Sequence, residues 1–239
     1  MLFLIYRLLV AIYAVVITFL SIFHYPVGRL SWPVWLTNLS YLLVTFHLVC
    51  AAVIVLVYTI FKDQQSSDST VIPCSLKFNW LLFCIACPIA ILVTLTYFAA
   101  LFPHKNLDYV PEVDINLHLI NSVLVILEFT ISALPVRLLH VVYAFSFGLA
   151  YVIFSVIYWS VDHANYLYPG VLDWNAPVTS AVVSVVLLFV GIPLMHLILF
   201  AIYQLRMSIY SRCVDKQLHE SPSVQLSSVN SSSDQWLRY

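Results

Sequence analysis

The sequence predicts an all-α integral membrane protein, built as a bundle of six transmembrane helices. Of its 239 residues, 62% are hydrophobic and only 9% are charged, whereas a soluble domain keeps about 25% of its residues charged. Six apolar runs each reach the length of about 20 helical residues that a bilayer core requires. The formal net charge of −1 gives no indication of a nucleic-acid partner. Composition and hydropathy thus exclude most classes of soluble protein.

Each apolar run is predicted to form one membrane-spanning helix. The first run contains Arg7 and lacks a small-residue cleavage pattern, so we expect a retained helix and not a cleaved signal. The sixth run is too long for one straight crossing, and Pro193 is expected to kink it. We expect a membrane domain over residues 1–210 and a disordered, serine-rich tail over residues 211–239. The runs are Leu2 to Phe23, Val34 to Phe61, Phe78 to Phe102, Glu112 to Ala133, Val136 to Ser160 and Ala176 to Tyr210.

The distribution of basic residues predicts the orientation of these helices. If the amino terminus is cytosolic, eight Lys and Arg residues lie on the inner side and only two, Arg29 and Lys105, lie on the outer side. Because cytoplasmic flanks are normally the richer in Lys and Arg, both termini are predicted to be cytosolic. The eight inner residues are Arg7, Lys62, Lys77, Arg137, Arg206, Arg212, Lys216 and Arg238.

The fourth apolar run contains a stripe of polar residues. Asp114, His118, Asn121 and Glu128 follow one another at helical spacing and fall within an arc of about 80° on a regular α-helix. An ionisable group at membrane depth costs about 2.5 kcal/mol or more, so such groups normally face a protein interior or a water-filled cavity. We therefore treat these four residues as candidates for a functional site.

The predicted topology brings further polar groups to the same outer face. Thr37 and Asn38 begin the second run, while Asp114 and His118 begin the fourth. The loop between the fifth and sixth runs adds Asp162, His163 and Asp173. Most polar groups of an otherwise apolar chain are thus expected on one side of the membrane.

These residues suggest a nucleophile and a base. A histidine can accept the proton of a hydroxyl nucleophile when a neighbouring group fixes its tautomer. His118 is the candidate base, Thr37 is the candidate nucleophile, and Asp114 or Asn121 is the candidate orienting group. The alternative is that the same groups only form hydrogen bonds between helices, as Thr, Asn and His do in many membrane bundles.

Glu128 is expected about 21 Å below Asp114 along the helix axis, in the inner half of the membrane. Arg137 begins the next span near the inner interface, so an ion pair between Glu128 and Arg137 is the simplest prediction. A proton relay in a small proton-coupled transporter is the alternative.

Several common chemistries have no sequence signature here. The chain has no Gly-rich phosphate loop, no GxSxG turn and no His-Glu-x-x-His helix, which are the usual templates of soluble enzymes. Cys84 and Cys87 form a Cys-x-x-Cys pair inside an apolar run, where buried thiols are more common than a metal site. We expect neither a metal nor another cofactor.

Six short segments follow one another from the first run to the last loop: Phe3-Leu-Ile-Tyr-Arg7, Trp35-Leu-Thr-Asn38, Asn116-Leu-His-Leu-Ile-Asn121, Leu134-Pro-Val-Arg-Leu-Leu-His140, Ile157-Tyr-Trp159 and Tyr168-Pro-Gly-Val-Leu-Asp-Trp174. As a set they resemble the rolling stone family of multi-pass membrane proteins, whose founding member is associated with myoblast fusion. The resemblance implies a role in cell interaction or membrane fusion, with membrane lipids as partners and the plasma membrane favoured over the endoplasmic reticulum as location. No protein partner is indicated.

The rolling stone family is in turn similar to the androgen-induced-gene family of membrane hydrolases. Those enzymes cleave fatty acid esters of hydroxy fatty acids with an intramembrane threonine and histidine. The matching positions are Thr37 in Trp-Leu-Thr-Asn and His118 in Leu-His-Leu-Ile-Asn. This second resemblance implies a lipid-ester substrate, with Thr37 as nucleophile and His118 as base.

Overall fold

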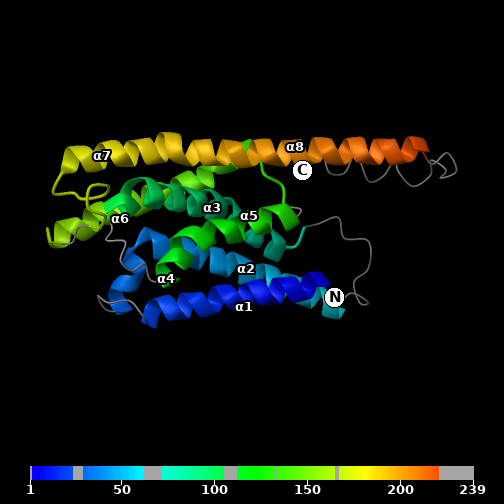
Figure 1. The fold of residues 1–239 in the computed structure, drawn as a ribbon, viewed down its shortest axis with the longest axis horizontal. Helices are drawn as coiled ribbons and strands as arrows, with labels where there is room; N and C mark the ends of the chain where they lie inside the picture. The colour runs from blue at the N-terminus through cyan, green and yellow to red at the C-terminus, as the bar shows by residue number, and fades with distance from the viewer. Residues whose placement is uncertain are drawn as a thin grey trace. The chain divides into compact units, whose positions relative to one another are not determined.

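The computed structural model describes residues 2–23, 29–61, 72–104, 112–132, 134–164 and 167–220. Six helices in these ranges are long and apolar enough to cross a membrane, which confirms the predicted fold class (Figure 1). The side of the membrane that each terminus faces stays a prediction, and Lys62, Lys105 and Arg238 lie outside the described residues. The six helices are Leu2–Phe23, Leu36–Phe61, Cys74–Leu101, Glu112–Ile131, Leu138–Val161 and Pro177–Val214.

The first three spans pack side by side. Helix α2 (Leu36–Phe61) lies between α1 (Leu2–Phe23) and α3 (Cys74–Thr96) (Figure 1). Small residues on one face of α1, including Ala11 and Ala14, are buried, and such residues let two membrane helices approach closely. The rest of α1 is largely exposed and apolar, as a lipid-facing surface must be.

Helix α3 is the most enclosed of the six spans. In the most apolar stretch of this span, 61% is buried inside the bundle. Helix α3 packs against α2, α5 (Asn121–Ile131) and α6 (Val141–Val161). Its buried residues are mostly small or weakly polar, among them Cys84, Ala86, Cys87 and Ala90. These small side chains allow α3 to be surrounded by other helices.

The fourth span is not one regular helix. It consists of α4 (Glu112–Ile115), a π-helical turn η5 (Asn116–Ile120) and α5. A π turn inserts one extra residue into the helix, so the segments before and after it are rotated relative to the 3.6-residue repeat assumed in the sequence argument. Asn121 and Glu128 are fully enclosed, whereas Asp114, before the π turn, is partly exposed.

The fifth and sixth spans meet at a glycine. A Cβ atom on Gly148 of α6 would lie 2.7 Å from Cδ1 of Ile192 and 3.0 Å from Cδ2 of Leu188. The sixth span consists of α7 (Pro177–Val186), a second π-helical turn η7 (Leu187–Gly191) and α8 (Ile192–Glu220). At the site of the predicted kink, the structure has η7, which ends two residues before Pro193. A proline lacks the amide N–H of a regular helix and clashes with the carbonyl four residues earlier, and the π turn contains that residue, Phe189.

The chain divides into two units, Met1–Leu199 and Phe200–Tyr239. Within the second unit, α8 continues to Glu220, ten residues beyond the predicted end of the membrane domain at residue 210. The predicted disorder of residues 221–239 falls outside the described residues. The functional candidates all belong to the first unit.

The loop between α6 and α7 folds back in a tight turn. Tyr168 forms an antiparallel bridge with Leu172, and the Tyr168 carbonyl accepts hydrogen bonds from the N–H groups of Val171 and Leu172 at 3.0 and 2.8 Å. Gly170 has a φ of 75°, a conformation that costs a glycine nothing and strains other residues. Leu167 and Leu172 pack with Tyr151 of α6 and anchor the loop on the bundle.

Candidate functional site

An apolar cavity lies inside the first unit. Its volume, measured as space open to a water-sized sphere, is about 90 Å³, and it is open on one side. The second, third, fourth, fifth and sixth spans and the tight turn all contribute to its wall. Most lining side chains are Leu, Ile or Val, so the few polar ones mark where chemistry could occur. The polar lining residues are Thr37, Thr96, Tyr97, His118, Tyr151, Tyr168 and Ser184.

Three π-helical turns border this cavity. Tyr97 and Leu101 come from η3 (Tyr97–Leu101), His118 comes from η5, and Leu187 and Leu188 come from η7. Helices rarely contain π turns, and those that do occur are frequently found at functional sites. Their convergence on one cavity supports a functional role for it.

Thr37 lies in the first turn of α2 and is buried. Its hydroxyl Oγ1 is 3.5 Å from the phenolic oxygen of Tyr168. The N–H of Thr37 donates to that same oxygen at 3.3 Å, and the N–H of Leu36 donates to the phenolic oxygen of Tyr151 at 3.0 Å. Two tyrosines thus satisfy amide groups that have no partner within the helix, and the Thr37 hydroxyl is held at the cavity wall.

His118 lies in the wall of the same cavity on η5 and is held on two sides. Its Nε2 is 3.4 Å from Oδ1 of Asp114, one turn earlier. Its ring stacks on Tyr97 with ring centroids 3.5 Å apart, and the Tyr97 hydroxyl donates to Oδ2 of Asp114 at 2.5 Å. The structure therefore brings together Asp114 and His118, as the spacing predicted. A carboxylate beside an imidazole is the arrangement that orients a general base.

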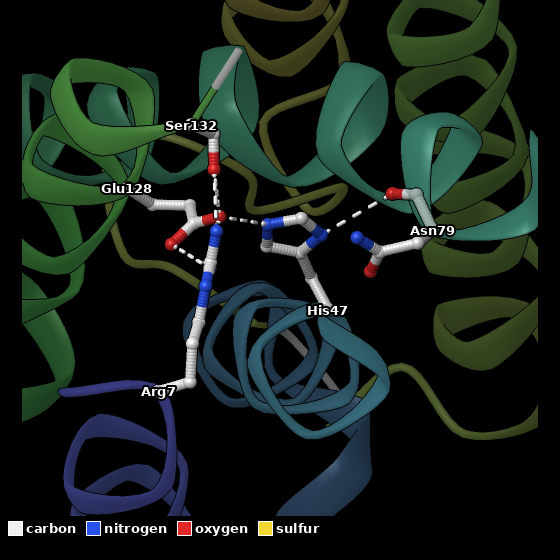
Figure 2. Close-up of polar contacts among 5 residues, drawn as sticks. All are labelled: Arg7, His47, Asn79, Glu128 and Ser132. Atoms are coloured by element: carbon white, nitrogen blue, oxygen red, sulfur yellow. Dashed lines mark hydrogen bonds and ion pairs between the residues drawn. The ribbon is translucent and has the colours of Figure 1, made fainter. Parts of the chain in front are cut away.

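Glu128 is the centre of a separate polar cluster deeper in the bundle. Figure 2 shows its carboxylate between the Arg7 guanidinium of α1, the Ser132 hydroxyl and the His47 ring of α2. His47 Nε2 is 3.3 Å from Glu128 Oε1, and His47 Nδ1 is 3.2 Å from the backbone oxygen of Asn79 on α3. Arg7 Nη2 also donates to Ser132 Oγ at 2.8 Å. The cluster thus joins the first four spans.

The predicted ion pair between Glu128 and Arg137 is wrong, because the cationic partner of Glu128 is Arg7. Arg137 is exposed, and its guanidinium lies 5.5 Å from the ring centroid of Trp80. Arg137 lies in the extended link between α5 and α6, with φ −112° and ψ 143°, whereas Arg7 lies on the buried face of α1, which packs beside α4. Because Arg7 is buried against Glu128, it does not count as a basic residue at the membrane surface. The predicted orientation then depends on seven inner against two outer basic residues.

Comparison with known proteins identifies the family. A family model described as "Protein rolling stone" matches residues 1–221. The chain belongs to the rolling stone family. It is 28% identical over 185 residues to the protein named Protein rolling stone from Drosophila melanogaster, and the match covers 72% of this chain and 66% of that relative. No solved structure matches the chain.

The two asparagines predicted for the site, Asn38 and Asn121, do not line the cavity of this rolling stone family member. Asn38 Nδ2 donates to the backbone oxygen of Trp32 at 2.7 Å. Asn121 Nδ2 donates to Ser40 Oγ on α2 at 3.1 Å. The second contact confirms that the polar faces of the second and fourth spans meet, although here the two residues join helices and do not line the cavity.

The acidic and histidine residues predicted for the site in the loop between α6 and α7 make local contacts. Asp162 Oδ1 accepts the N–H of Ala164 at 2.9 Å, and Asp173 Oδ1 accepts the N–H of Asn175 at 3.0 Å. The His163 ring stacks on Trp159 with centroids 4.4 Å apart. Such bonds stabilise turns.

The loop between α6 and α7 also contributes Tyr168 to the cavity wall, beside Thr37, and helical spacing does not point to this residue. The available signal was a tyrosine beside Pro169-Gly170, since this dipeptide predicts a tight turn that can fix a neighbouring side chain. Over the ranges that the structure describes, no group of three or more His, Cys, Asp and Glu residues is placed to hold a metal ion.

Proposed function

We propose that this rolling stone family member is an intramembrane hydrolase of lipid esters, with Thr37 as nucleophile and His118 as general base. The observation that carries the proposal is that a buried hydroxyl on α2 and an imidazole on η5 line one apolar cavity. Asp114, in contact with both His118 and Tyr97, is the positioning residue. The cavity walls favour an acyl chain as the part of the substrate that is enclosed.

The proposed reaction has two steps. In the first, His118 takes the proton of Thr37 Oγ1 as this oxygen attacks the ester carbonyl carbon. The tetrahedral intermediate collapses, the ester C–O bond breaks, and the imidazolium returns the proton to the leaving alcohol. In the second, His118 takes a proton from water as the water oxygen attacks the acyl-threonine. The acid leaves, and the imidazolium returns that proton to Thr37 Oγ1. Both transfers need the reacting atoms within about 3.2 Å or one bridging water.

The apolar lining of the cavity supports a lipid ester as the proposed substrate class. Long-chain esters, such as fatty acid esters of hydroxy fatty acids, offer an apolar chain for the cavity and one ester group for the polar end. Access from the bilayer would deliver such a substrate without transfer through water. Membrane lipids are therefore the proposed source of substrate.

The role in cell interaction or membrane fusion is a second proposal, compatible with the first because a lipid hydrolase can change the composition of the membranes that fuse. Location at the plasma membrane belongs to this proposal and can be tested by surface biotinylation. The proton-coupled transporter receives less support, because Glu128 is bound by Arg7, His47 and Ser132 and does not line the cavity.

The enzyme proposal can be tested with purified protein in detergent or vesicles. The wild-type protein should label with a fluorophosphonate probe and release fatty acid from a long-chain ester. Thr37→Ala should abolish both signals, and His118→Ala should slow both by about 100-fold or more. Thr45→Ala is the matched control for Thr37, since Thr45 is equally buried at 6% exposure on the same helix but bonds Thr18 at 3.0 Å. His196→Gln is the control for His118, since His196 is buried against the Arg137 backbone oxygen.

Two results would contradict the proposal. The first is labelling and ester cleavage that persist in folded Thr37→Ala protein or proceed at the wild-type rate in folded His118→Ala protein. The second is a folded wild-type protein that cleaves no member of a panel of fatty acid esters. Cell mixing that requires the protein but is unchanged by Thr37→Ala would separate the fusion role from hydrolysis.

A further inference from the structure

We infer that Tyr168 is the hydrogen-bond donor that stabilises the oxyanion formed when Thr37 attacks an ester. This inference rests on the proposed function and adds a third catalytic residue to it. Acyl transfer develops negative charge on the carbonyl oxygen, and an enzyme needs a donor aimed at that oxygen. Among the groups at the cavity wall, the Tyr168 phenol has the geometry for this role.

The phenol is placed beside the nucleophile by two contacts. Its oxygen is 3.5 Å from Thr37 Oγ1 and accepts the Thr37 N–H at 3.3 Å. An ester carbon bonded to Thr37 Oγ1 would place its carbonyl oxygen one bond farther away, within reach of the phenolic proton. Tyr168 also lines the cavity, so substrate can contact it.

The phenolic proton of Tyr168 can turn towards a substrate. A phenol has one O–H donor and accepts through its oxygen. The Thr37 N–H and the hydroxyls of Thr37 and Tyr151 are the partners of the Tyr168 hydroxyl, and those that donate to its oxygen leave its proton available. Tyr151 differs, because its hydroxyl donates to the backbone oxygen of Val34 at 3.0 Å while it accepts the Leu36 N–H. Tyr151 therefore supports the start of α2, and Tyr168 is the donor of the pair that faces the reaction.

The turn holds the phenol in a fixed position. The Tyr168 ring meets the edge of Trp35 with centroids 5.1 Å apart, and its carbonyl closes the turn through Val171 and Leu172. Burial of its hydroxyl end raises the pKa of Tyr168 above the usual value, so the phenol keeps its proton at neutral pH. A donor that is already in place needs no reorganisation during the reaction, which is the condition for strong oxyanion stabilisation.

The test is the Tyr168→Phe variant, which keeps the ring and its packing on Trp35. Loss of one oxyanion donor lowers kcat by about 100-fold to 1,000-fold in other enzymes, and we expect a loss of this order with little change in KM. Tyr158→Phe is the matched control, because Tyr158 belongs to the same packed group but does not line the cavity. The control should retain wild-type kcat.

A binding measurement separates transition-state stabilisation from a structural effect. A long-chain trifluoromethyl ketone, which forms a tetrahedral adduct with a hydroxyl nucleophile, should bind Tyr168→Phe about 100-fold more weakly than wild type. The corresponding long-chain ether, which resembles the ground state, should bind both proteins equally. Only folded protein binds either ligand. The ratio of the two dissociation constants is therefore unaffected if part of the variant misfolds.

The outcomes test the oxyanion role of Tyr168 separately from the proposed hydrolase activity. If Thr37→Ala is inactive but Tyr168→Phe retains wild-type kcat and ketone affinity, Tyr168 is not the oxyanion donor and the hydrolase proposal stands. If ether and ketone lose affinity equally, Tyr168 only shapes the cavity and the inference is overturned. If folded wild-type protein has no esterase activity, both proposals fail.

Discussion

Arg7 and Glu128 form a buried ion pair between the first and fourth spans, 121 positions apart in the chain. Figure 2 shows that the Ser132 hydroxyl and the His47 ring also contact the Glu128 carboxylate. A charged group inside a membrane bundle is tolerated when an opposite charge and further hydrogen bonds satisfy it. The Arg7–Glu128 pair therefore fixes the position of α1 along α5, which hydrophobic contacts alone would not specify.

Removing one member of this pair should destabilise the protein strongly. Arg7→Met leaves the Glu128 carboxylate without its cation, and Glu128→Gln leaves the Arg7 guanidinium without its anion. Breaking a buried pair in this way typically costs about 3–5 kcal/mol, because the remaining charge stays buried. Each single variant should unfold at a markedly lower temperature than wild type in thermal denaturation in detergent.

The double variant Arg7→Met/Glu128→Gln provides the decisive comparison. Since it buries no uncompensated charge, it should recover a large part of the stability lost in either single variant. Arg137→Gln is the control, because Arg137 is exposed and contacts Trp80. Single variants as stable as wild type would contradict a structural role for the pair.

The sequence predicted the spans and the meeting of the second and fourth helices well, because hydropathy and helical spacing determine both. It placed Thr37 and His118 at the same end of their helices, and the structure has both in one cavity wall. The spacing also paired Asp114 with His118, since an i,i+4 contact is local and survives the π turn.

The sequence did not predict contacts that depend on tertiary arrangement. Proximity in the chain predicts Arg137 as the partner of Glu128, whereas Arg7 reaches Glu128 only because α1 packs beside α2 and α4. Tyr168 likewise acquires its position from a turn that folds back onto α2. Such positions follow from how elements pack, and a hydropathy pattern does not encode that packing directly.

Asp114 should act with His118 as one unit. Asp114→Asn keeps the side-chain shape but removes the charge that holds the imidazole, and general-base catalysis is worth about 10²–10⁴-fold in rate. We expect fluorophosphonate labelling of Thr37 to slow by about 100-fold or more in Asp114→Asn. The double variant Asp114→Asn/His118→Ala should label no more slowly than His118→Ala alone, because residues that act together are not additive.

Asp162→Asn is the control for this carboxylate, since Asp162 is exposed and accepts a bond from its own turn. It should label at the wild-type rate. A multiplicative loss in the Asp114→Asn/His118→Ala double variant would show instead that the two residues act independently.

Gly148 should set the space available to long acyl chains. Its missing side chain leaves room for Ile192 and Leu188, which line the cavity. Gly148→Leu would push these side chains into the cavity, so we expect the ratio of kcat/KM for long-chain over short-chain esters to fall about tenfold or more, in line with the loss of several methylene contacts. Ser146→Leu, which adds the same side chain to an exposed position of α6, should leave the ratio unchanged, and an unchanged ratio in Gly148→Leu would show that the acyl chain lies elsewhere.

Gly170 should be required for the position of Tyr168 more than for the stability of the bundle. Its φ of 75° costs an L-residue roughly 1–2 kcal/mol, although a Cβ atom there would meet open space. Gly170→Ala should therefore lower the unfolding free energy by about 1–2 kcal/mol at most, since relaxation of the exposed turn relieves part of the strain. Because relaxation would move the Tyr168 phenol away from Thr37, kcat should fall more than this small loss of stability suggests.

Gly170→Asn is the matched variant, since asparagine tolerates this conformation better than alanine does, and it should retain more activity than Gly170→Ala. Equal kcat values for the two variants and wild type, measured with a long-chain ester, would show that the turn does not position the phenol.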